Sequence, residues 1–64
     1  MIDAIDIKIL SILQRDGRCH LADIANKVEL SAPAVMERVR KLEARGIITG
    51  YHAFVDAKKV GKDI

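Results

Sequence analysis

Residues 21–46 read LADIANKVELSAPAVMERVRKLEARG, and the spacing of their apolar residues predicts two helices joined by a short break. Apolar residues fall on one side of a helix at 21–28, and polar residues fall on the other. A longer helix is expected from Ser31 to about Arg45. The apolar residues that repeat along it are Val35, Val39 and Leu42. Two helices in this order, the second opening with a small polar residue and carrying basic residues, are typical of the helix-turn-helix motif.

Local signals mark the ends of these helices. Ser31 is a favourable N-cap, and Pro33 is tolerated in the first turn because the N–H that it lacks would have no helical partner there. Gly46 is suited to ending the longer helix. The start of the shorter helix is marked less well, since His20 occupies the N-cap position, where Ser, Thr, Asp or Asn is favoured.

A third apolar stripe predicts another helix at residues 3–16. The residues of this stripe are Ile2, Ile5, Ile9, Ile12 and Leu13. Asp3 is suited to cap the start of the helix, and Gly17 is suited to end it with a left-handed residue. Ile7 lies on the side opposite the stripe, so it is either a lone exposed side chain or part of a subunit contact.

The pattern changes after Gly46, where β-favouring residues continue to position 55. We expect a short extended piece at 47–49, a turn or bulge at Gly50 and a strand at 51–55. The predicted fold class is mainly α: a three-helix, winged-helix-like helix-turn-helix domain, followed by a short two-stranded or hinge β element. Residues 1–50 are assigned to the helical domain, and residues 51–64 to the hinge strand and the start of a linker.

Length and composition narrow the possible functions. A chain of 64 residues is one small domain, and at this size roughly 60% of the unfolded surface is buried, so oligomerisation is expected to add stability. Cys19 is the only cysteine, so it is expected to be a reduced, small and buried apolar side chain in a cytoplasmic protein, the alternative being a redox sensor. Asp3 and Asp6 stand where a signal peptide would carry positive charge, and no apolar stretch is long enough to cross a membrane.

Residues with catalytic or metal-binding spacing are not found in the sequence. Cys19, His20 and His52 are the only soft or imidazole ligands, and three scattered groups form neither a zinc site nor a supported nucleophile. There is no glycine-rich phosphate loop. We therefore expect no enzymatic activity, no metal and no cofactor in this chain.

Basic residues concentrate on the longer helix of the pair. The whole chain has a net charge of +2, which by itself says little about function. Four cations, however, stand within eight positions: Arg38, Arg40, Lys41 and Arg45. This cluster is either a solvated helix face, with Glu37 paired to Lys41, or a surface that binds DNA.

If this helix enters the major groove, its first residues and its outward-facing side chains meet base edges. The expected base contacts are Ser31, Ala32, Pro33, Met36, Glu37 and Arg40. The guanidinium of Arg40 matches guanine, Met36 suits a thymine methyl group, and Glu37 either accepts from cytosine or orients Arg40. The expected phosphate contacts are Arg38, Lys41 and Arg45, each of which is otherwise only a solvated charge.

Three segments resemble the N-terminal, DNA-binding half of the Lrp/AsnC (feast/famine) transcriptional regulators. They are DAIDIKILSILQRDGR at 3–18, LADIANKVELSAPAVMERVRKLEARGIITGY at 21–51 and FVDAKKVG at 54–61. The resemblance implies a winged-helix-like domain that binds double-stranded operator DNA, a hinge strand at 51–55 that helps to form a dimer, and a C-terminal domain that binds amino-acid effectors. Because the chain stops where that domain would begin, we expect a truncated form, the alternative being a naturally solitary DNA-binding module.

Three residues depart from the pattern of these regulators. Glu29 stands in the turn where the family usually has Gly, and a left-handed conformation there would cost on the order of 1 kcal/mol. His20 replaces a small polar cap. Ile7 replaces a residue that is often charged, which supports the subunit-contact interpretation.

The sequence therefore predicts a sequence-specific transcriptional regulator, with amino-acid metabolism implied by the resemblance alone. We expect it to bind operator DNA as a homodimer or higher oligomer, through the helix that begins at Ser31. The expected dimer contacts are Ile7, Tyr51, His52, Ala53, Phe54 and Val55. The alternative is a winged helix that serves dimerisation or protein docking and does not bind DNA.

Overall fold

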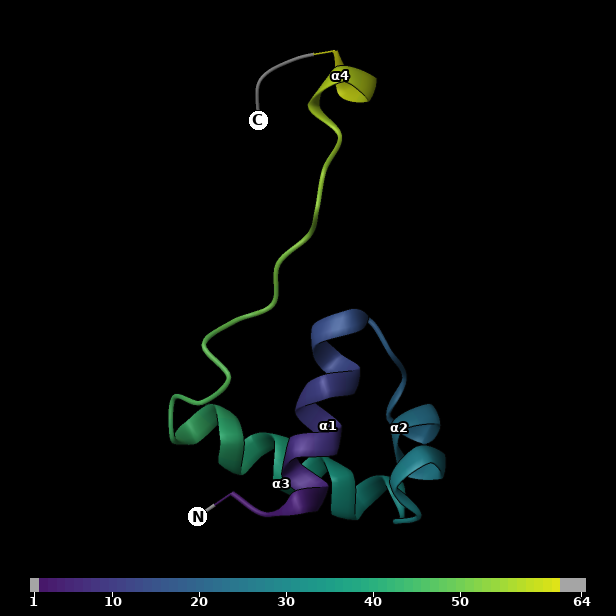
Figure 1. Ribbon diagram of the computed structural model, residues 1–64, viewed down its shortest axis with the longest axis vertical. Coiled ribbons are helices and arrows are strands. Elements are labelled where there is room, and N and C mark those ends of the chain that lie inside the picture. Colours follow the sequence, from purple (N-terminus) through teal and green to yellow (C-terminus); the bar gives the residue numbers. More distant parts are fainter. Residues whose placement is uncertain (1, 62–64) are drawn as a thin grey trace.

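Three helices pack against one another in the computed structural model, which describes residues 2–61 (Figure 1). They are α1 (Ala4–Arg15), α2 (Leu21–Val28) and α3 (Ala32–Ala44), and a one-turn helix, α4 (Ala57–Val60), follows near the end of the described chain. The three predicted helices are confirmed, and their ends lie within one residue of the predicted ones. No helix among the described residues is long and apolar enough to cross a membrane.

The core forms where the apolar faces of the three helices meet. Ile9 of α1, Ile24 of α2 and Val35 of α3 are almost completely buried, and each such side chain stabilises the fold by about 1.5–3 kcal/mol. Ala25 is buried between α2 and α3, and its small side chain lets the two helices approach closely. Half-buried residues surround this centre, and Cys19 is one of them rather than a fully buried residue.

The two ends of α1 are built differently. At its start, Asp3 and Asp6 form a capping box, in which each carboxylate accepts a hydrogen bond from the backbone N–H of the other. At its end, the expectation of a left-handed Gly17 is wrong. The chain instead leaves the helix through Asp16, whose backbone is extended at φ −148° and ψ 95°, and the Asp16 carboxylate accepts from the backbone N–H of Arg18.

The starts of α2 and α3 differ in their capping, as the sequence predicts. His20 makes no capping hydrogen bond through its side chain, and Glu29 adopts the left-handed conformation with φ 60° and ψ 42°. The hydroxyl of Ser31 accepts from the backbone N–H of Ala34 at 3.3 Å, as expected for an N-cap. After α3, Gly46 has a φ of 74° and turns the chain away from the helix.

The segment after Gly46 forms an arm that leads away from the three helices (Figure 1). The backbone N–H groups of Ile47 and Ile48 still donate to Leu42, but residues 49–55 make no backbone hydrogen bonds with the rest of the described chain. No strand is present within residues 2–61, so the predicted β element is not confirmed. A strand needs a hydrogen-bonded neighbour, and residues 2–61 provide none for this segment.

The arm ends in a helix that the sequence analysis missed. The carboxylate of Asp56 caps α4 by accepting from the backbone N–H groups of Lys58 and Lys59, and Gly61 ends it with a φ of 74°. Asp56, a favourable N-cap residue, and Gly61, a favourable residue for ending a helix, were the signals in the sequence that indicate this helix. Residues 62–64 of the predicted linker lie outside the described residues, and the division of the chain at residue 50 stays a prediction.

Candidate nucleic-acid interface

Helix α3 has one buried face and one exposed face. Val35 and Leu42 point into the protein and are buried. The side chains of Pro33, Glu37 and Arg40 are exposed, as the helical periodicity predicts. The exposed face therefore contains three of the six residues that were expected at base edges.

The first turn of α3 is only partly accessible. Ser31 and Pro33 are exposed, whereas Ala32 and Met36 are half-buried, and Ala32 packs against the core. The six residues expected to contact bases thus do not share one exposed surface. The most accessible of them are Ser31, Pro33, Glu37 and Arg40.

The charged side chains on the exposed face make few ion pairs. Lys41 lies 3.4 Å from Glu37 in an i,i+4 pair that is largely solvated, so the pair contributes little to stability. Among the described residues, no ion pair or side-chain hydrogen bond involves Arg40 or Arg45. Both guanidinium groups are therefore available to an anion such as DNA.

Arg38 is held by the N-terminus of α1, which the sequence analysis did not predict. Its Nη1 donates to both carboxylate oxygens of Asp3, at 2.9 and 2.8 Å, and to Oδ1 of Asp6 at 3.1 Å. The hydrogen bond from Arg38 holds the pKa of Asp3 below its ordinary value, and the hydrogen bond from Asp6 lowers it further. The sequence contains the two acidic residues at the start of α1 and the arginine in α3, but no local pattern indicates that residues this far apart form a pair.

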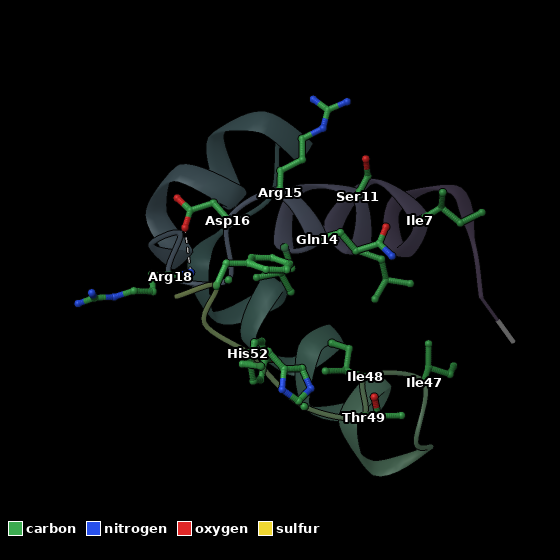
Figure 2. Close-up of a pocket in the computed structure, with 16 residues that line it drawn as sticks. Ile7, Ser11, Gln14, Arg15, Asp16, Arg18, Ile47, Ile48, Thr49 and His52 are labelled. Carbon is green, nitrogen blue, oxygen red and sulfur yellow. Dashed lines mark hydrogen bonds between the residues drawn. The ribbon is translucent and has the colours of Figure 1, made fainter. Parts of the chain in front are cut away.

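A second exposed surface lies between α1 and the arm. It is a hollow of about 1030 Å³, lined on one side by Ile7 and other residues of α1 and on the other by residues 47–52 and Phe54 (Figure 2). Ile7 is 60% exposed, and Phe54 is fully exposed. Of the expected dimer contacts, the structure places Ile7, Tyr51, His52 and Phe54 in this one hollow, while Ala53 and Val55 lie outside it.

Two further lining residues, Ile47 and Ile48, were not expected to belong to this surface. Their signal was present as consecutive isoleucines directly after Gly46. The sequence pattern assigned them to a short extended piece, and it contained nothing to indicate that this piece faces α1 across a hollow.

The sequence of residues 2–49 matches the family described as winged helix-turn-helix DNA-binding. The chain belongs to this family. This winged helix-turn-helix chain is 49% identical over 63 residues to the leucine-responsive regulatory protein of Rhizobium meliloti strain 1021, a match that covers 98% of the chain and 40% of that relative. It is 45% identical over 60 residues to the transcriptional regulator LrpC of Bacillus subtilis strain 168, covering 94% of the chain and 42% of LrpC.

Solved structures show the same helical arrangement. The structure of B. subtilis LrpC matches with a TM-score of 0.84 at 44% identity, over 95% of this chain and 44% of that one. The structure of E. coli AsnC matches with a TM-score of 0.82 at 34% identity, over 95% of this chain and 41% of that one. The resemblance to the Lrp/AsnC regulators and the mainly helical winged-helix fold are confirmed. The chain spans about two fifths of the length of these relatives.

These relatives are transcriptional regulators rather than enzymes, in agreement with the prediction of no catalytic role for this winged helix-turn-helix chain. Within residues 2–61, no group of His, Cys, Asp or Glu side chains is arranged to hold a metal ion.

Proposed function

We propose that this chain is the DNA-binding part of a transcriptional regulator, and that α3 enters the major groove of operator DNA. The observation that carries the proposal is the exposed face of α3, where Arg40 has no partner among residues 2–61 and where Ser31 and Pro33 are accessible at the start of the helix. A recognition helix presents its N-terminal part to base edges in this way.

Within this proposal the side chains of α3 have different roles. Arg40 donates its paired N–H groups to guanine, and Glu37 accepts from cytosine or orients Arg40. Ser31 and Pro33 contact base edges at the start of the helix, and Ala32 and Met36 contact them from its flank. Lys41 and Arg45 contact phosphates, which would release Lys41 from its weak pair with Glu37.

Selection of duplexes from a random pool, followed by affinity measurements, tests this proposal. We expect Arg40→Ala to weaken binding to the selected operator by roughly 1–3 kcal/mol and to relax preference at one base position. Lys8→Ala, which removes the same charge from an exposed position on α1 outside the hollow, is the matched control and should have little effect.

Two outcomes would contradict this assignment. If Arg40→Ala weakens binding equally for every sequence, Arg40 contacts a phosphate and does not read a base. If the unmodified chain binds no duplex even at low salt, the alternative of a dimerisation or protein-docking winged helix is correct.

We also propose that the chain acts as a homodimer, and that a second copy covers the hollow beside α1. The hollow is lined by exposed apolar side chains, and residues 49–55 have backbone groups without partners in the described chain. Pairing of residues 51–55 with the same residues of a second copy would satisfy these groups in an antiparallel ladder. Two copies would then reach two half-sites about 34 Å apart.

Regulation of amino-acid metabolism is the third part of the proposal. It is supported by the names of the relatives, which include a leucine-responsive regulatory protein and a glutamate uptake regulatory protein. The selected operator should then be found upstream of genes for the transport or metabolism of amino acids, in the genome that encodes this chain. Operators found only upstream of unrelated genes would refute this part.

A further inference from the structure

Arg38 joins α3 to the capped N-terminus of α1. Its Nη1 lies within hydrogen-bond distance of three carboxylate oxygens, two of Asp3 and one of Asp6. The Asp6 side chain is only 13% exposed, and that of Arg38 is 30% exposed, so the cluster is partly shielded from water. Charge-assisted hydrogen bonds of this kind are stronger and more directional than neutral ones.

The capping box holds both carboxylates in place before Arg38 binds them. Oδ1 of Asp3 accepts from the backbone N–H of Asp6 at 2.9 Å, and Oδ2 of Asp6 accepts from the backbone N–H of Asp3 at 3.3 Å. The acceptors that face Arg38 are therefore fixed to the first turn of α1. A guanidinium bound to them restrains the rotation of α3 about its own axis, which the burial of Val35 and Leu42 also restrains.

That rotation determines where Arg40 points. Successive residues of an α-helix are separated by roughly 100°, so Arg40 lies roughly 200° around α3 from Arg38. Because Arg38 is directed to α1, Arg40 is directed to the opposite side, where it is exposed. The two arginines therefore do not share one DNA-facing surface.

We propose that Arg38 is a positioning residue for DNA recognition: through Asp3 and Asp6 it sets the orientation of α3 that presents Arg40 to the bases. This proposal rests on the proposed DNA-binding function. It replaces the expectation that Arg38 contacts a phosphate, because the Nη1 group of Arg38 is already bound by carboxylates of its own chain.

Asp3→Asn separates the two roles of Arg38, because they predict changes of opposite sign. Asparagine still caps α1, so the helix start is retained, but it lacks the charge that binds Arg38. If Arg38 positions α3, affinity for the selected operator falls by on the order of three- to tenfold. If Arg38 contacts a phosphate, affinity rises, because the substitution frees Arg38 and removes a negative charge near the DNA.

Asp23→Asn is the matched control, since it removes one negative charge from an exposed residue of α2 that lies outside the hollow beside α1. It reports the effect of net charge alone, against which Asp3→Asn is compared. Circular dichroism confirms that both variants remain helical. Affinity for a scrambled duplex should change less than affinity for the operator in Asp3→Asn, because positioning acts on base readout.

The salt dependence of DNA binding by Arg38→Gln gives a second test, because the loss of a phosphate contact would change it. The dependence of log affinity on log salt should keep its slope if Arg38 only positions α3, and should lose about one unit if Arg38 binds a phosphate. The double variant Asp3→Asn with Arg38→Gln should bind no more weakly than Arg38→Gln alone, since both remove the same pair.

The outcomes distinguish this inference from the function on which it rests. If the unmodified chain binds no duplex at low salt, both fail. If it binds its operator and Asp3→Asn binds as tightly as the Asp23→Asn control or more tightly, the DNA-binding function stands and the positioning role of Arg38 is overturned.

Discussion

The hydroxyl of Tyr51 donates a hydrogen bond of 2.9 Å to Oε2 of Glu43, in the last turn of α3. The ring of Tyr51 also lies beside Gly17, where an added Cβ would come within 3.8 Å of Cδ1 of Tyr51. Tyr51 thus contacts both the end of α3 and the turn after α1. The direction in which the arm leaves the three helices depends on these two contacts.

Tyr51 should lose its proton at a higher pH than an unperturbed tyrosine. Burial raises the pKa of the hydroxyl, and the hydrogen bond to Glu43 raises it further, because a phenolate would lie beside a carboxylate. The chain has one tyrosine and no tryptophan, so the ultraviolet absorbance of tyrosinate reports this residue alone. We expect a midpoint above the ordinary value of about 10.

Glu43→Gln should move this midpoint back toward about 10. Because the pKa of Tyr51 is raised in the folded state, the contribution of its neutral hydroxyl to the free energy of unfolding is complete below the unfolded pKa. This contribution is lost as the pH rises through the folded pKa. Equal midpoints near the ordinary value in both proteins would show that the hydrogen bond to Glu43 does not persist in solution.

The left-handed Glu29 should be a site where a substitution stabilises the protein. Its φ of 60° costs a side chain on the order of 1 kcal/mol, which glycine would not incur. Glycine also makes the unfolded chain more flexible, which offsets part of the gain. We expect Glu29→Gly to raise the free energy of unfolding by about 0.5 kcal/mol in urea denaturation. Glu29→Ala removes the same carboxylate but keeps the strain, so it should show no gain, and an equal gain in both variants would refute the strain argument.

The ion pair of Asp3 and Arg38 should make stability depend on pH in the acid range. The pKa of Asp3 is lowered in the folded state, mainly by the hydrogen bond from Arg38. The contribution of the Asp3 carboxylate to the free energy of unfolding is therefore complete above the unfolded pKa of about 3.9. It is lost as the pH falls through the lower, folded pKa. Thermal midpoints of the unmodified chain and of Asp3→Asn, measured from neutral pH down to strong acid, should differ at neutral pH and converge in acid. A difference that stays constant with pH would show that the charge of Asp3 is not its source.

Ile7 should affect association and leave the helices unchanged. It is 60% exposed and lines the hollow that we propose a second copy covers. Ile7→Glu places a charge in this apolar surface, so sedimentation at micromolar concentration should show more monomer, with the same helicity by circular dichroism. Lys8→Glu is the control, because it adds a glutamate to an exposed position of α1 that does not line the hollow.

Two results would count against the dimer. If Ile7→Glu changes neither the association constant nor the thermal midpoint, Ile7 is only an exposed side chain, and pairing through residues 51–55 remains the sole dimer contact. If the chain is monomeric and still binds a complete operator at nanomolar affinity, no dimer is needed for recognition.

The sequence by itself determined the three helices and the residues that cap the starts of α1 and α3. The apolar repeats of α1, α2 and α3 specify a face for each helix, and an apolar face has to be buried whatever its partner is. Ser31, Asp3 and Gly46 act through hydrogen bonds or backbone angles within a few residues, so their roles can be predicted without the rest of the structure. A left-handed Glu29 was considered only because the resembling regulators usually have Gly at this position.

Only the tertiary structure decided the roles of residues whose partners are distant in the sequence. Arg38 and Arg40 are both arginines in the middle of α3, yet Arg38 is bound by Asp3 and Arg40 is exposed. The difference arises because the packing of α1 on α3 places a carboxylate beside Arg38 only. Residues 51–55 have strand-forming side chains, but a strand needs hydrogen-bonding partners, and residues 2–61 of one chain supply none. Local propensity acts through neighbouring residues, whereas pairing depends on which surfaces the completed fold brings together.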